Sequence, residues 1–225
     1  MGDTTWTAYV KRGPITPTVL HEIYASDQAM YPAPLAFERL RDWVDVAGTD
    51  FSFAVYSDAD QTDGEGVLIG AVIALPLRKT SWDALVMGEL KETSVIASRD
   101  LWTPADSEAR LGVHVFHVEV YRDSVAGRQV RGFVRRAVDE IVETFKARGV
   151  VMEGLSALTA TDQGRRCFLN LGFEPTGYEE VWVRRSPDGP TELVVFRHGG
   201  DEQDQTRTRP GEVLGRAQMM VKKTR

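Results

Sequence analysis

The fold is decided by residues 112–160, which read GVHVFHVEVY (112–121), RDSVAGRQVR (122–131), GFVRRAVDEIVETFKARG (132–149) and VVMEGLSALTA (150–160). The first segment is rich in β-branched and aromatic residues, which is typical of a strand. The third repeats apolar residues at helical spacing and closes with Gly149, where a helix is expected to end. The fourth resumes the strand pattern. Together they predict a strand, a tight turn, a helix and a second strand, with a right-handed crossover.

Shorter elements are predicted around this unit. Before it we expect a strand over residues 5–12, a helix after the N-cap Thr16, a helix over 33–47 and a hairpin of strands over 51–57 and 67–77. After it we expect a helix over 162–172 and a hairpin of strands over 179–185 and 191–198, around the turn SPDGP.

Two segments fit no strand pattern. Residues 78–110 predict an insertion of one or two short helices, and the charged residues 199–225 predict a mobile tail that ends in a short docking helix. The rest predicts an α/β protein (α+β, mixed sheet) in a single domain over residues 1–198. A chain of 225 residues, 42% of them hydrophobic, suffices for one such core and is too short for two.

Charge and cysteine content exclude several classes of protein. A formal net charge of -6 argues against a surface built for nucleic acid or anionic membranes, and suits a neutral or cationic small molecule. The single cysteine, Cys167, excludes internal disulfides and indicates a reducing compartment. No segment has the pattern of a signal peptide or membrane span. We therefore expect a cytoplasmic protein that binds neither nucleic acid nor membranes.

The turn before the central helix, RDSVAGRQVRGFVRRAV (122–138), combines glycines with arginines. Backbone N–H groups at such a turn and at a helix N-terminus attract phosphate groups. Gly127 and Gly132 permit close approach, and Arg128 and Arg131 add positive charge. The stretch fits an ordinary turn with a solvated helix face equally well, and a basic patch for nucleic acid is a third interpretation. Nucleotide-triphosphate loops and dinucleotide fingerprints are excluded by their glycine and lysine spacing.

The order of elements resembles that of the GNAT superfamily of acetyl-CoA-dependent N-acetyltransferases, and the resemblance extends over about residues 5–198. Gly132 stands at the last glycine of the family's phosphate turn, whereas Val130 stands at its usual first glycine. TATDQGRRCFLNLGF (159–173) is similar to the family's segment that ends in Leu-Gly-Phe. The resemblance implies a central twisted sheet with a splayed βαβ core that binds acetyl-CoA, and a C-terminal β-hairpin.

The resemblance also implies which residues bind acetyl-CoA, the acyl donor. They are Val118, Val120, Gly127, Arg128, Gln129, Val130, Arg131, Gly132, Phe133, Thr161 and Phe168. Thr161 stands at the family's usual Asn. Phe168 stands at a Tyr that often protonates the departing thiolate, and phenylalanine has no proton to give.

Three residues are candidates for catalysis. The resemblance implies a carboxylate on the strand before the turn, here Glu119, which would deprotonate the acceptor amine. Strand alternation puts His117 beside Glu119, on one face with Val113 and Val115, and an ionisable pair in an apolar strand is costly unless it is paired or faces a cleft. Tyr178 is a substitute for the missing Tyr. Each also has a structural interpretation, as a solvated sheet edge, a structural ion pair or a half-buried hairpin tyrosine.

The function implied is transfer of an acetyl group from acetyl-CoA to a primary amine, by direct attack, with a small molecule or a peptide as acceptor. The alternative is a GNAT-fold protein that binds CoA or a partner without turnover. The insertion at 78–110 fits an acceptor pocket or the interface of a homodimer. We expect no metal site, because His114 and His117 lie three apart on a strand and alternation puts them on opposite faces. Cys167 is interpreted as a packing residue.

Overall fold

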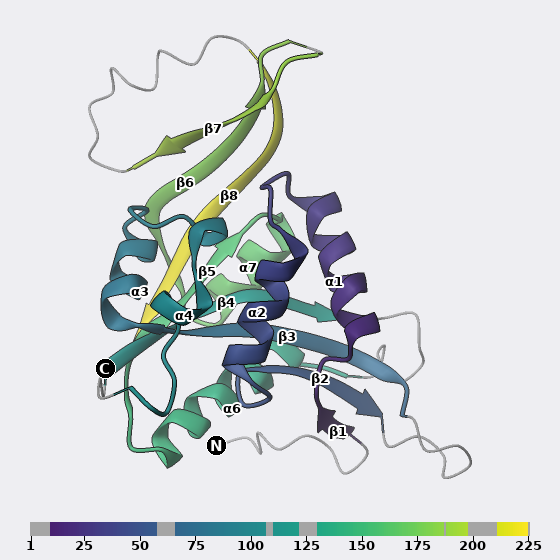
Figure 1. Ribbon diagram of the computed structural model, residues 1–225, viewed down its shortest axis with the longest axis vertical. Coiled ribbons are helices and arrows are strands. Elements are labelled where there is room, and N and C mark those ends of the chain that lie inside the picture. Colours follow the sequence, from purple (N-terminus) through teal and green to yellow (C-terminus); the bar gives the residue numbers. More distant parts are fainter. Residues whose placement is uncertain are drawn as a thin grey trace.

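The computed structural model describes residues 10–57, 66–106, 110–121, 130–186, 188–197 and 211–224. These residues form one sheet with the strand order β1-β2-β3-β4-β5-β8-β6-β7 (Figure 1). The strands are β1 (Val10–Gly13), β2 (Ser52–Ser57), β3 (Leu68–Arg78), β4 (Arg110–Val120), β5 (Val151–Thr159), β6 (Glu174–Arg184), β7 (Thr191–Phe196) and β8 (Glu212–Lys223). The helices are α1 (Pro17–Met30), α2 (Phe37–Ala47), α3 (Lys79–Val86), α4 (Ala97–Asp100), α6 (Phe133–Ala147) and α7 (Asp162–Asn170), with a 3-10 turn η1 (Glu92–Ser94).

The central unit is the one predicted from residues 112–160. β4 and β5 pair in parallel, and α6 connects them, while the other neighbouring strands are antiparallel, so the sheet is mixed. α6 forms because its apolar residues recur on one side, and Ala137, Ile141 and Phe145 are buried there. The α/β fold class predicted from the sequence is confirmed.

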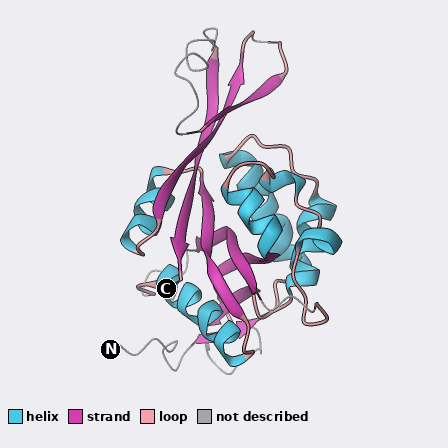
Figure 2. Ribbon diagram, turned by 90° about the vertical axis from the view of Figure 1, so that its left-hand side faces the viewer, coloured by secondary structure: helices cyan, strands magenta, loops and turns pink. Residues whose placement is uncertain are grey.

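Helices cover both faces of the sheet (Figure 2). One face packs against α6 and α7 in a core that includes Val113, Val115 and Phe145. The opposite face packs against α1, α2 and α3, in a second core that includes Ile73 and Trp43. We call this second side the α1–α2 face. α1 begins as predicted, because the Thr16 hydroxyl accepts a hydrogen bond from the backbone N–H of Val19.

A bulge in β4 overturns the predicted alternation of its side chains. Ile73 pairs with His117 and Ala74 with Val115, so Phe116 is an extra residue on β4. Beyond it the strand is shifted by one residue. Val113 and Val115 therefore share the α6 side with Val118 and Val120, and the predicted grouping of the first two with His117 and Glu119 was wrong.

The bulge also places two histidines on one face. His114 bonds to groups of the insertion, and Phe116 stacks edge-on against Trp43 of α2, so both lie on the α1–α2 face. His117 interacts electrostatically with Asp27 of α1 and lies on that face too. The expectation that His114 and His117 lie on opposite faces was therefore wrong.

The predicted tail is wrong for residues 212–223, which form β8. This strand pairs with β5 on one side and β6 on the other. The C-terminal hairpin of β6 and β7 is present as predicted, but among the described strands it is β8 that joins it to the rest of the sheet. These three strands extend beyond the helices at the top of Figure 1.

Candidate functional site

β4 and β5 part near the middle of the sheet. Their parallel pairing runs from Arg110–Val151 to Val115–Ala157 and then stops, although β4 continues to Val120. Among the described residues, no strand pairs with this side of β4 beyond Val115. The predicted splay of the βαβ unit is therefore present.

The parted edge of β4 offers backbone groups at defined positions. The N–H of Tyr121 donates to the carbonyl of Ile69 on β3, at 2.8 Å. Because backbone groups of a strand alternate between its two neighbours, the N–H and C=O of Val118 and Val120 point to the parted side. These are two of the residues that the resemblance implies for binding acetyl-CoA.

α6 follows β4 in the chain and begins at Phe133. Its N-cap is Gly132, in the left-handed region with φ 69°, and a Cβ there would meet nothing within 4 Å. Arg131 is exposed, Val130 packs against the α6 core, and Phe133 is buried in it. The remaining predicted turn residues, Gly127, Arg128 and Gln129, lie outside the described residues.

α7 carries the Leu-Gly-Phe segment. The hydroxyl of Thr161 caps the helix by accepting from the N–H of Gly164 at 3.0 Å. Phe168 is buried and packs edge-on against Phe173, with ring centroids 4.9 Å apart, so it serves the core. Cys167 is half-buried, and burial raises the pKa of its thiol, as suits the predicted packing role.

His117 and Glu119 form the predicted pair. Nε2 of His117 lies 3.3 Å from Oε2 of Glu119, and the side chains are 6% and 33% exposed. Asp27 of α1 is the third charged group here. Burial raises the pKa of Asp27, whereas a hydrogen bond from Gln28 and the neighbouring His117 lower it. The sequence did not indicate Asp27, since it lies some 90 positions before the pair and only the packing of α1 against β4 brings it close.

The pKa of Asp27 predicts a pH-dependent effect on stability. Because the folded state raises this pKa, folding favours the protonated form. The contribution of Asp27 to the stability of the folded state is fully present below about pH 4, near the ordinary pKa of an Asp side chain. It is lost as the pH rises through the raised pKa of the folded state. Asp27→Asn should therefore gain stability relative to the wild type as the pH rises from 4 to 8. Thermal melts over this range measure it, and a difference that stays constant with pH would contradict the assignment.

Tyr178 is held in a buried network. Its hydroxyl donates to Oε1 of Glu180 at 2.5 Å and accepts from Nζ of Lys91 at 2.7 Å. The hydroxyl of Tyr31 also donates to Glu180, at 2.9 Å. Burial and the Glu180 charge raise the pKa of Tyr178. Its proton is thus engaged with Glu180, and the network joins the insertion, β6 and the end of α1.

A second carboxylate–histidine pair, which the sequence pattern does not predict, lies on the α1–α2 face. Nε2 of His114 lies 2.6 Å from Oε1 of Glu92, and Nδ1 lies 3.0 Å from the hydroxyl of Ser156. Nε1 of Trp82 donates to the same hydroxyl at 3.0 Å. The sequence feature that could have indicated this pair is a histidine inside an apolar strand that follows an insertion containing acidic residues. Strict alternation does not predict the face of His114 correctly, because it leaves out the bulge in β4.

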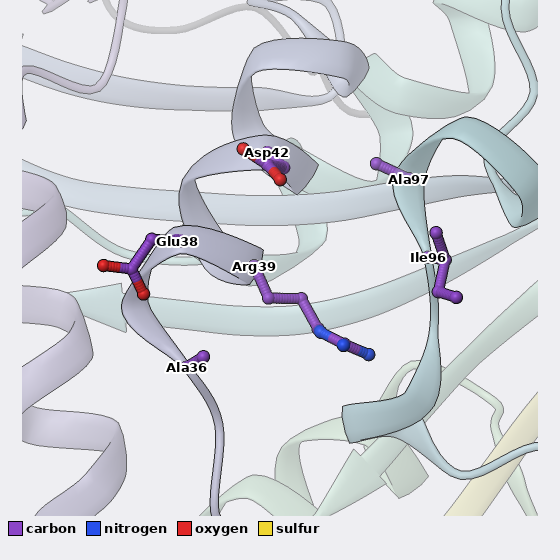
Figure 3. Close-up of a pocket in the computed structure, with 6 residues that line it drawn as sticks. All are labelled: Ala36, Glu38, Arg39, Asp42, Ile96 and Ala97. Atoms are coloured by element: carbon purple, nitrogen blue, oxygen red, sulfur yellow. The ribbon is translucent and has the colours of Figure 1, made fainter.

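One surface depression is separate from these groups. It lies between α2 and α4 and is lined by Ala36, Glu38, Arg39, Asp42, Ile96 and Ala97 (Figure 3). Its lining includes none of the predicted site residues. Within the described ranges, no three His, Cys, Asp or Glu side chains come together as a metal site would require. Nor does any described helix have the length and apolar character to cross a membrane.

No protein-family model matches the sequence, and no curated protein matches it. Solved structures do match in fold. Arabidopsis thaliana NAA60 in complex with acetyl-CoA has a TM-score of 0.51 at 14% identity, over 95% of this chain and 98% of that one. The same protein with a bisubstrate analogue has a TM-score of 0.52 at 12% identity, over 96% and 99%. Arabidopsis thaliana Naa50 with the bisubstrate analogue CoA-Ac-MVNAL has a TM-score of 0.50 at 10% identity, over 96% and 100%. The chain therefore has the fold of the GNAT N-acetyltransferases that its sequence resembles.

Proposed function

We propose that the protein transfers an acetyl group from acetyl-CoA to a primary amine. The observation that carries this proposal is the parting of β4 from β5 after Val115–Ala157, beside the N-terminus of α6. The fold neighbours bound to acetyl-CoA or to bisubstrate analogues support it. Acetyl-CoA supplies the acetyl group as an activated thioester.

The chain's own groups fit the donor. The backbone of Val118 and Val120 would pair with the amide groups of the pantetheine arm, and an N–H there would polarise the thioester carbonyl. The N-terminus of α6 at Gly132 and Phe133 would face the pyrophosphate, and Arg131, Val130 and the sequence-predicted residues 127–129 would complete the site. The Thr161 hydroxyl caps the N-terminus of α7, the helix that follows β5.

The acceptor would reach the thioester from the α1–α2 face. Carboxylates gather there from separate elements, Asp27 from α1, Glu92 from η1 and Glu119 from β4. Such a face favours a cationic amine, because an ammonium group gains charge-assisted hydrogen bonds. An amino-terminal peptide and a small amine both meet this description, and the peptide-derived analogue in the Naa50 structure favours the former.

Glu119, with His117 beside it, is proposed to take the proton that the acceptor ammonium loses before attack. Alkyl amines are largely protonated at neutral pH and attack only in the neutral form. Glu119 is one-third exposed, so the proton can pass from it to solvent.

Two measurements test the function. Release of free thiol from acetyl-CoA in the presence of a panel of amines and peptides should exceed the amine-free rate. Calorimetric titration with acetyl-CoA should give saturable binding. Binding without thiol release from any acceptor would favour the alternative, a protein of this fold that holds CoA without turnover.

Gly132→Ala should weaken CoA binding about 10-fold. The left-handed conformation at Gly132 costs an alanine roughly 1–2 kcal/mol, and relief of that strain would turn the helix N-terminus away from the phosphates. Gly149→Ala is the matched control, because Gly149 has φ 67° and equally open surroundings at the other end of α6. Both variants should lose similar stability in thermal melts. Equal CoA affinity in the two variants would remove Gly132 from the donor site.

A further inference from the structure

Glu92 contributes negative charge to the proposed acceptor face, but neither Glu92 nor its partner His114 has yet been given a part in proton transfer. His114 is fully buried, and the Glu92 side chain is 10% exposed. His114 faces Ser156 across the β4–β5 ladder, one rung before the last pair at Val115–Ala157. It therefore lies two residues, or roughly 7 Å along the strand, from Phe116, where the parted edge begins.

The hydrogen bonds of this pair run in one direction. Trp82 donates to the hydroxyl of Ser156, whose own proton is then free to bond Nδ1 of His114. The remaining ring proton, on Nε2, is donated to Glu92. The insertion that carries Glu92 is fixed directly after it, since the carbonyls of Thr93 and Val95 accept from Arg39 and Trp43 of α2. Glu92 is thus held in place at the end of a series of hydrogen bonds that runs from Trp82 through Ser156 and His114.

Several ionisable groups face Glu92. They are His114 from β4, Asp27 and Tyr31 from α1 and its C-cap, and Tyr178 and Glu180 from β6. Burial raises the pKa of Glu92, the bond and charge of His114 lower it, and the charges of Asp27 and Glu180 raise it. A carboxyl group in such a setting can hold a proton closer to neutral pH than an exposed one.

The reaction needs two proton acceptors. An acceptor ammonium loses one proton before attack, and Glu119 is assigned to it. The nitrogen lone pair then forms the N–C bond, and the C–S bond breaks with its electron pair passing to sulfur. The nitrogen must lose a second proton and the sulfur must gain one, so that amide, free thiol and one solvent proton result. The second proton stays within the site, and the buried Glu92 is suited to carry it.

Resting on the proposed function, we propose that Glu92 carries the second proton from the acceptor nitrogen to the donor sulfur, and that His114 positions Glu92 for this step. Ser156 and Trp82 act through His114 and fix its ring.

The test compares two acyl donors in three variants. Glu92→Gln keeps the bond to His114, because the Gln carbonyl accepts from Nε2–H, and should therefore fold. With acetyl-CoA it should lose about 100-fold in kcat/KM. With p-nitrothiophenyl acetate, the thiolate leaves without needing a proton and the nitrogen can lose its second proton to water after departure, so the loss should shrink to about 5-fold or less. Glu119→Gln should lose equally with both donors, because the first deprotonation precedes either departure. Glu38→Gln, on the exposed side of α2, is the control and should match the wild type.

A readout independent of turnover is the NMR chemical shift of the Nε2–H proton of His114, which should differ between the wild type and Glu92→Gln because its hydrogen-bond acceptor changes from a carboxylate to an amide. An unchanged chemical shift would overturn the pairing, and an equal loss of Glu92→Gln with both donors, or no loss, would overturn the proton transfer. A wild type that releases no thiol with any amine would overturn the proposed function itself, and it is recognised before the variants are compared.

Discussion

Gly112→Ala is expected to destabilise the protein by about 1–3 kcal/mol, the range for overpacking a filled core. A Cβ at this position would lie 2.1 Å from the indole ring of Trp82. Gly112 is paired with Gly154 across the β4–β5 ladder, and a Cβ there would also approach Trp82, at 3.0 Å. The two glycines leave the space in which the indole lies. Trp82 is buried and hydrogen-bonded to Ser156, so moving its indole aside would lose core packing and this hydrogen bond.

The loss should appear as a fall in Tm of about 2–4 °C for each kcal/mol in a chain of this length. Gly13→Ala is the matched control, because its Cβ would meet only the ring edge of Tyr56, at 3.3 Å, near the surface. A double-mutant cycle with Trp82→Ala isolates the clash, and Gly112→Ala should cost much less in that background. A cost that is the same in both backgrounds would show that the indole is not the cause.

Glu119→Gln is expected to lower kcat with acetyl-CoA by about 100-fold or more, the usual effect of removing a group that takes a proton. The amide keeps the shape of the carboxylate and can still contact His117, so the fold should be preserved. The loss should be greatest at low pH, where less of the acceptor amine is neutral without help, and should shrink as the pH approaches the pKa of the free amine.

Two controls separate this role from a general loss of structure. Calorimetric titration should give unchanged affinity for acetyl-CoA, because the proposed donor site is made by the β4 backbone and α6 and not by the Glu119 side chain. Glu179→Gln, on the opposite side of β6 from this face and bonded to Arg216, should leave the pH–rate profile unchanged. If Glu119→Gln has the wild-type pH–rate profile, Glu119 takes no part in the proton transfer.

Much of the fold follows from local pattern. The helices around Leu40 and Ile141 and the strands of the central unit were predicted because their apolar residues recur at helical or strand spacing. β8 was not, because its burial comes from long-range pairing with β5 and β6, while its own sequence mixes Arg216 and Gln218 with apolar residues.

The site was predictable in part. The pair of His117 and Glu119 follows from two ionisable residues in an apolar strand. The pair of His114 and Glu92 does not, since strict alternation assigns His114 to the wrong side once Phe116 is inserted as a bulge. A bulge depends on how β3 and β4 pair, and no feature local to β4 reports it.

The position of β8 has a consequence for synthesis. Among the described strands, it follows all others in the chain yet lies between β5 and β6. When β1 to β7 have left the ribosome during synthesis and β8 has not, the sheet therefore consists of two fragments, β1 to β5 and β6 with β7, each with an exposed edge. They can join only after residues 212–223 emerge, and until then the edges of β5 and β6 are open to pairing with other chains.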